Sequence, residues 1–193
     1  TLDDVPFTDL RSLALQDGKI AILDASSGVK ILNGDFGVTK EINITSDFGN
    51  FSKRTLDFSD DMIVVSEGSK GAGIYDANSG NLMEHLPILI NPEGVADQDV
   101  VTNAVASNDG IILMANGGAG LCLSEEQGSN PDLVGIIELT GSINYVASKG
   151  DYIFAASGKK GVQVIKLNRP SNSLAEECAS SPVYSGRANL NVN

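Results

Sequence analysis

The chain has 193 residues, of which 41% are hydrophobic and 20% charged, and its formal net charge is −12. This length and apolar content are enough for one or two packed domains, so the composition argues against a disordered chain. The acidic balance argues against nucleic acid as a partner, because binding to a phosphate backbone needs clustered lysine and arginine. No apolar run approaches the roughly 20 residues of a membrane helix, so we predict no membrane span.

Four copies of one pattern recur along the chain at a period of about 44 residues. Each copy holds a turn dipeptide, an isoleucine two residues later and a glycine eight residues after the isoleucine. The isoleucines are Ile20, Ile63, Ile112 and Ile153, and the glycines are Gly28, Gly71, Gly120 and Gly161. Because each unit must stack on its neighbours to bury its apolar surface, the pattern predicts a repeat architecture.

Each unit is predicted to begin with a strand and a tight hairpin turn. Seven residues before each isoleucine stands an aliphatic residue, namely Leu13, Leu56, Val105 and Val146. The turn dipeptides are Asp17-Gly18, Asp60-Asp61, Asp109-Gly110 and Gly150-Asp151. Residues of these types accept the positive φ that a two-residue hairpin turn requires.

The isoleucine of each unit opens a second strand that is apolar on both faces, which indicates a strand covered from both sides. A third strand follows at the repeated glycine, whose place at the end of a short connection predicts a left-handed backbone conformation. The resulting hairpins span residues 13–31, 56–74, 105–123 and 146–164. Apolar segments between the units, such as 86–90 and 133–139, are predicted to supply a fourth strand.

Units of four antiparallel strands are typical of the blades of a β-propeller. We therefore predict an all-β fold, with residues 1–193 forming a single propeller domain or arc of about four blades. Closed propellers have about four to eight blades, so we expect a partial ring of a six- to eight-bladed propeller. The remaining blades or a second chain would cover the open sheet faces, and residues 170–193 would add an outer or closing strand.

The third strands, especially 71–76 and 161–165, resemble those of the LVIVD-repeat propellers found among bacterial extracytoplasmic and surface proteins. The resemblance spans about residues 10 to 168. The family's aspartate after the third strand stands clearly only at Asp76, and its regular proline has one possible counterpart, Pro170. The resemblance implies an extracellular, periplasmic or cell-surface propeller that binds a partner, and it carries over no catalytic residue.

Few residues offer catalytic or metal-binding chemistry. His85 is the only histidine, so the sequence assembles no Ser-His-Asp or Cys-His constellation and we predict no catalytic residue of that kind. Cys122 and Cys178 lack the paired spacing of a zinc site. They leave two alternatives open, one disulfide or two buried thiols.

Carboxylates are plentiful, and two groups of them invite a functional interpretation. The cluster at 57–61 and the pair Asp97 and Asp99 are candidates for an acid/base pair or a calcium site, although aspartate in a hairpin turn is expected for backbone reasons alone. The long loop at 91–102 is the most unusual connection. If a ligand is bound through loops, we expect Glu93, Asp97 and Asp99 to contact it. We predict no cofactor, with calcium at these carboxylates as the alternative.

Two hypotheses of function follow. The first is a noncatalytic binding or scaffolding propeller of the bacterial cell surface or envelope that recognises protein or glycan through its loops. The alternative is a part of a carbohydrate-active enzyme that uses carboxylates, with its active site shared with missing blades. The shortage of catalytic side chains favours the first hypothesis.

Overall fold

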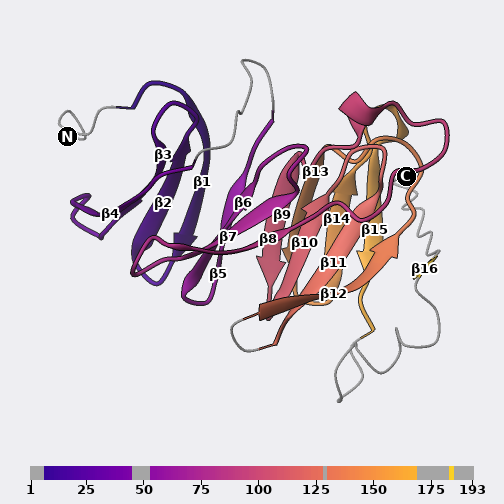
Figure 1. Ribbon diagram of the computed structural model, residues 1–193. Coiled ribbons are helices and arrows are strands. Elements are labelled where there is room, and N and C mark those ends of the chain that lie inside the picture. Colours follow the sequence, from indigo (N-terminus) through magenta and orange to yellow (C-terminus); the bar gives the residue numbers. More distant parts are fainter. Residues whose placement is uncertain (1–6, 45–52, 128–129, 169–182, 185–193) are drawn as a thin grey trace.

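A computed structural model describes residues 7–44, 53–127, 130–168 and 183–184. Within these ranges the strands form four sheets, and helix is limited to the short 3-10 turns η1 (Asp97–Asp99) and η2 (Gly158–Lys160). The sheets follow one another as the blades of a β-propeller (Figure 1), which confirms the predicted fold class.

The blades are numbered in chain order. Blade 1 contains β1 (Leu10–Gln16), β2 (Lys19–Asp24), β3 (Gly28–Leu32) and β4 (Val38–Ile42). Blade 2 contains β5 (Leu56–Ser59), β6 (Met62–Ser66), β7 (Ala72–Asp76) and β8 (Leu82–Leu86). Blade 3 contains β9 (Ala104–Asn108), β10 (Ile111–Ala115), β11 (Leu121–Gln127) and β12 (Asn130–Ile137). Blade 4 contains β13 (Tyr145–Lys149), β14 (Tyr152–Ala156) and β15 (Val162–Lys166). Consecutive strands pair antiparallel within every blade.

The outer strands differ from the expectation in two places. The fourth strand of blade 2 is β8, which ends at Leu86. The strand expected at 86–90 therefore overlaps with it at one residue, and its position was predicted wrongly. Blade 3 gains an additional outer strand, because β16 (Val183–Tyr184) pairs in parallel with β12. The rest of segment 170–193 lies outside the described residues. Among the described residues blade 4 has three strands.

The predicted turn chemistry is confirmed in all four units. The first turn residue has a positive φ in each, namely Asp17, Asp60, Asp109 and Gly150. The repeated glycines also adopt positive φ, between 77° and 91°. At Gly71 a Cβ atom would overlap with the carbonyl group of Leu86, so this position excludes a side chain by both conformation and space.

Neighbouring blades pack face to face. Their first strands are in contact, and apolar side chains of the two facing sheets form a core between them. Strand β1 packs on β5, β5 on β9 and β9 on β13. One apolar core joins blades 1 and 2, a second joins blades 2 and 3, and a third joins blades 3 and 4. The second strands of the two central blades, β6 and β10, are buried along their whole length, which confirms the prediction of strands covered from both sides.

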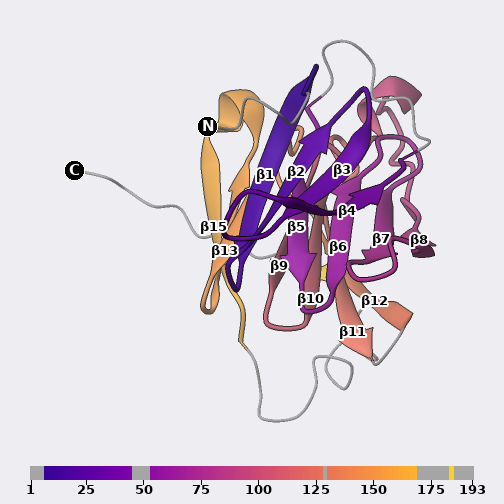
Figure 2. The ribbon, with the colours of Figure 1, turned by 90° about the vertical axis from the view of Figure 1, so that its left-hand side faces the viewer.

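The prediction holds only in part for the second strands at the two ends of the series, since Ile20 and Ile22 on β2 are half-buried and Phe154 on β14 is exposed. The first strand of blade 1 is exposed as well. Leu13 on β1 is 64% exposed, whereas the equivalent Leu56, Val105 and Val146 are at most 4% exposed. On blade 4, Phe154 is 40% exposed, whereas the equivalent Leu113 is fully buried. Blade 1, which faces the viewer in Figure 2, and blade 4 therefore each present one uncovered apolar face.

Cys122 is a free, buried thiol on β11, and burial raises its pKa to about 12. Cys178 lies outside the described residues. Across the described ranges, no helix combines the length and the apolar composition that crossing a bilayer demands.

Candidate functional site

The four first strands line a cavity of about 180 Å³. Its lining comes from β1, β5, β9 and β13, and the charged side chain in it is Asp57. The Asp57 carboxylate accepts the backbone N–H groups of Phe58 at 2.9 Å and Ser107 at 2.8 Å, so it ties blade 2 to blade 3. Burial raises the pKa of Asp57, against the effect of these two hydrogen bonds. This member of the predicted 57–61 cluster thus has a structural role between blades.

A set of hydrogen-bond donors lies just before the residues of the first strands that line this cavity. Two residues before Leu13, Leu56, Val105 and Val146 stand Arg11, Arg54, Asn103 and Asn144. Because the four first strands are equivalent in the repeat, these side chains belong to the same level of the propeller. We call them the donor set.

The two asparagines of the donor set hold the neighbouring chain. Asn103 Nδ2 donates to the carbonyl of Ile143 at 3.3 Å, and Asn144 Nδ2 donates to the carbonyl of Ser142 at 2.9 Å. Both asparagines therefore fasten the segment that leads into blade 4.

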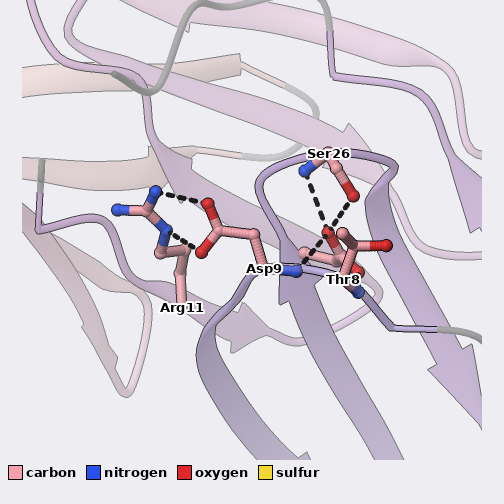
Figure 3. Close-up of polar contacts among 5 residues, drawn as sticks. Thr8, Asp9, Arg11 and Ser26 are labelled. Carbon is pink, nitrogen blue, oxygen red and sulfur yellow. Dashed lines mark hydrogen bonds and ion pairs between the residues drawn. The ribbon is translucent and has the colours of Figure 1, made fainter. Parts of the chain in front are cut away.

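Arg11 is a charge-balanced member of the donor set. Its Nε and Nη2 atoms donate to the two carboxylate oxygens of Asp9 at 2.7 and 2.5 Å, the paired geometry visible in Figure 3. The hydrogen bond that Arg11 donates to Asp9 is the main reason that the pKa of Arg11 is raised. Asp9 is itself fixed, because its backbone N–H donates to Asp24 at 3.2 Å.

Arg54 is different, because it is buried without a carboxylate partner among the described residues. Its side chain is only 7% exposed, and its Nη1 donates to the carbonyl of Lys53 at 2.5 Å. Its Nε atom is buried and has no acceptor in the described part of the chain. Burial, and secondarily the charge of Arg11, lower the pKa of Arg54. Burying a guanidinium that has an unsatisfied donor lowers the stability of the fold, unless an anion accepts its hydrogen bonds.

A glycine makes room for this guanidinium. Gly68 has a φ of +66°, and a Cβ atom there would lie 2.6 Å from Nη2 of Arg54. Gly68 also forms an isolated β-bridge with Thr102, the residue before Asn103. Arg54 therefore lies where blades 2 and 3 meet, at the level of the donor set.

The predicted ligand residues of the 91–102 loop lie elsewhere. Glu93, Asp97 and Asp99 are all exposed, and Asp97 lines a separate cavity of about 270 Å³, where it accepts a hydrogen bond from Asn91 at 3.1 Å. The carbonyl of Asp99 accepts the N–H of Gly118 at 2.7 Å, which docks the loop on blade 3. No three metal-binding side chains are grouped anywhere in the described residues. Ligand or calcium binding by this loop stays a prediction.

His85 lies on the outermost strand of blade 2, and its Nε2 is 3.2 Å from Oε2 of the buried Glu67. No local sequence pattern predicted this pair, because 18 residues separate its members. The donor set, in contrast, was accessible from the sequence, since counting back two residues from the repeated aliphatic positions finds it.

Comparisons with known proteins bear on the fold. No protein-family model matches the sequence, and no curated protein matches it significantly. Among solved structures, the chain is similar to the computationally designed Ika4 protein, with a TM-score of 0.58 at 14% identity over 86% of this chain and 95% of Ika4. It is also similar to the designed Ika8 protein, with a TM-score of 0.58 at 16% identity over 85% of this chain.

The match covers 48% of Ika8, so this chain spans about half the length of that protein. At these identities the likeness concerns the fold alone. The LVIVD-repeat resemblance has no family match behind it, and it stays a prediction.

Proposed function

We propose that this chain is a noncatalytic binding propeller that takes an anionic group of a protein or glycan ligand at its donor set. The observation that carries the proposal is the buried guanidinium of Arg54, which has no carboxylate partner among the described residues. An oxyanion would supply the acceptor that its Nε lacks, and paired hydrogen bonds to carboxylate or phosphate are the interaction for which a guanidinium is best shaped.

The local electrostatics support the same proposal. The chain as a whole carries 25 acidic residues and a net charge of −12, yet Arg54 and Arg11 lie close enough for one to lower the pKa of the other. An uncompensated positive site in an acidic protein attracts a small anionic group of a ligand and excludes bulk polyanions by repulsion from the surrounding surface.

The enzyme alternative has less support. His85, the only histidine of the chain, is directed to Glu67 on the outer side of blade 2. The carboxylate of Asp57, a residue that lines the cavity, is occupied by two backbone N–H groups. Neither arrangement supplies the free pair of carboxylates that glycoside hydrolysis needs.

The experiment is a titration of the 193-residue chain with sodium glucuronate, sodium acetate and inorganic phosphate at constant ionic strength, followed by the NMR signals of arginine Nε–Hε groups and, in all variants, of the backbone amides. We expect a saturable shift of the Arg54 signal. Arg54→Gln should weaken the binding at least tenfold, because one neutral donor group replaces the charged fork. Lys160→Gln, at an exposed turn residue, is the matched control and should leave the affinity unchanged.

Equal and unsaturable shifts in both variants would indicate a general ionic-strength effect and reject the site. Cleavage of an acidic oligosaccharide by the purified chain would reject the noncatalytic assignment. The proposed location at the bacterial cell surface or envelope rests on the LVIVD resemblance alone, and fractionation of cells that express the natural gene tests it separately.

A further inference from the structure

The first uncovered surface is the β1 side of blade 1, because Lys30 and Leu32 on β3, which share this face, are buried. Leu13 and Leu15 on β1 are 64% and 69% exposed. Their equivalents in blade 2, Leu56 and Phe58, are 4% and 5% exposed because blade 1 packs on them. The face of blade 1 that would receive a preceding blade is therefore of the same apolar kind as the faces that do receive one.

The second uncovered face belongs to blade 4. Tyr152, Phe154 and Val162 are 46%, 40% and 62% exposed. The positions equivalent to Val162 in the other blades are Val29, Ala72 and Leu121, all fully buried. In each of those blades the next blade covers this face, and blade 4 has no next blade among the described residues.

Polar contacts between blades repeat as well. Gln16 Nε2 donates to the carbonyl of Asp60, the first turn residue of the next blade, at 2.7 Å. Asn108, the equivalent of Gln16 in blade 3, donates to the carbonyl of Gly150 at 2.6 Å. The equivalent donor position in blade 4 is Lys149, which is exposed.

The acceptor equivalent to Asp60 in blade 1 is Asp17, which is also exposed. The two ends of the series thus carry complementary apolar faces and opposite charges at the positions where the internal contacts form. All three internal interfaces have the apolar packing, and two of them also have the polar contact; the missing interface would join blade 4 to a blade 1.

We infer that a second copy of this chain covers both faces, with blade 4 of each copy packed on blade 1 of the other. When the rotation between the two copies is half a turn, the same contact forms twice and the pair closes as a two-fold symmetric dimer. One chain carries both complementary surfaces, so two copies cover all four uncovered faces at once. The similarity to about half of the longer Ika8 protein shows that this fold is compatible with a structure that continues beyond its length.

Sedimentation velocity and light scattering of the 193-residue chain between about 1 and 100 µM test this inference. We expect a dimer that dissociates on dilution. Phe154→Asp and Leu13→Asp, one on each face, should each raise the dissociation constant at least 100-fold while circular dichroism stays unchanged. Leu89→Asp, at a 56% exposed leucine outside both faces, is the matched control and should leave it unchanged.

Charge reversal tests the proposed contact between Lys149 of one copy and Asp17 of the other. Lys149→Glu should weaken the dimer about tenfold, and the double variant Lys149→Glu with Asp17→Lys should restore it. A chain that stays monomeric throughout the concentration range, or one that forms assemblies of more than two copies, would overturn the inference. So would a dimer that Phe154→Asp and Leu13→Asp leave intact.

Discussion

The hydroxyl of Tyr75 donates a hydrogen bond of 2.6 Å to Oε1 of Glu67, and the two side chains are 4% and 3% exposed. Glu67 follows β6, at the position that Asp24, Asn116 and Ser157 occupy in the other blades, and all four residues are buried. Burial and the Glu67 carboxylate raise the pKa of Tyr75, so the phenol remains a donor throughout the accessible pH range. The Glu67 carboxylate is thus buried inside blade 2, where the Tyr75 hydroxyl donates a hydrogen bond to it.

Tyr75→Phe should therefore destabilise the protein by about 1–3 kcal/mol, because the buried carboxylate loses a donor while the aromatic packing is kept. Chemical denaturation measures the change in the free energy of unfolding. Tyr145→Phe, at a 51% exposed tyrosine, is the control and should change it by less than about 0.5 kcal/mol. Equal effects of the two substitutions would show that the hydroxyl of Tyr75 contributes nothing.

Asp24 makes stability depend on pH in the acid range. Burial opposes its ionisation, but hydrogen bonds from Ser26, Thr8 and Asp9 outweigh burial and lower its pKa from 3.8 to about 2. The folded carboxylate therefore binds its proton less readily than the unfolded one. The resulting stabilisation, about 2 kcal/mol, is present above pH 4 and is lost as the pH falls towards 2.

Asp24→Asn should lower the free energy of unfolding by about 2 kcal/mol at pH 7, and its difference from the parent should shrink between pH 4 and pH 2. Urea denaturation at several pH values measures this convergence. Asp35→Asn, at an exposed aspartate, should follow the parent at every pH. A deficit in Asp24→Asn that is the same at pH 7 and pH 2 would contradict the electrostatic origin.

Two of the repeated glycines differ in the space around them. At Gly71 an added Cβ meets the Leu86 carbonyl, whereas at Gly161 nothing lies within 4 Å, and both have positive φ. Gly161→Ala should cost about 1–2 kcal/mol from backbone strain alone, and Gly71→Ala should cost clearly more. Gly34→Ala, where φ is not positive, should be close to neutral. Thermal unfolding of the three variants gives the order, and a smaller loss in Gly71→Ala than in Gly161→Ala would disagree with the structure.

Leu13 and Leu56 offer a matched pair, because they are the same residue at the same repeat position. In the dissociated chain, Leu56→Ala should destabilise by about 2–5 kcal/mol, since it empties a filled core position. Leu13→Ala should change the free energy of unfolding by less than about 0.5 kcal/mol there, because Leu13 is already in contact with water. Denaturation at the lowest measurable concentration tests this, and comparable losses would mean that the face of blade 1 is covered within a single chain.

We expect the buried charge of Arg54 to lower the stability of the protein when no anion is bound. Without a bound anion, Arg54→Met should raise the free energy of unfolding by about 1 kcal/mol or leave it unchanged, because an apolar side chain of similar length removes a buried unpaired charge. Added phosphate should stabilise the parent and not the variant. A parent and a variant that respond equally to phosphate would contradict anion binding at Arg54.

Much of the architecture could be predicted from local rules. Aspartate or glycine at the first turn position and glycine at the start of the third strand recur because those positions need positive φ, and this requirement acts within a few residues of chain. The alternation of side chains along a strand is equally local. Four such units at a nearly constant spacing therefore predicted propeller blades before any long-range contact was known.

Only the tertiary structure decided which equivalent positions are buried and which charges are paired. Leu13 and Leu56 have the same local sequence role, yet their exposures are 64% and 4%, because a blade covers one and not the other. Arg11 and Arg54 likewise occupy one repeat position, but within the described part of the chain Arg11 has an aspartate partner and Arg54 has none. Burial and ion pairing depend on groups that the fold brings from tens of residues away, and a repeat pattern carries no information on where the series of blades ends.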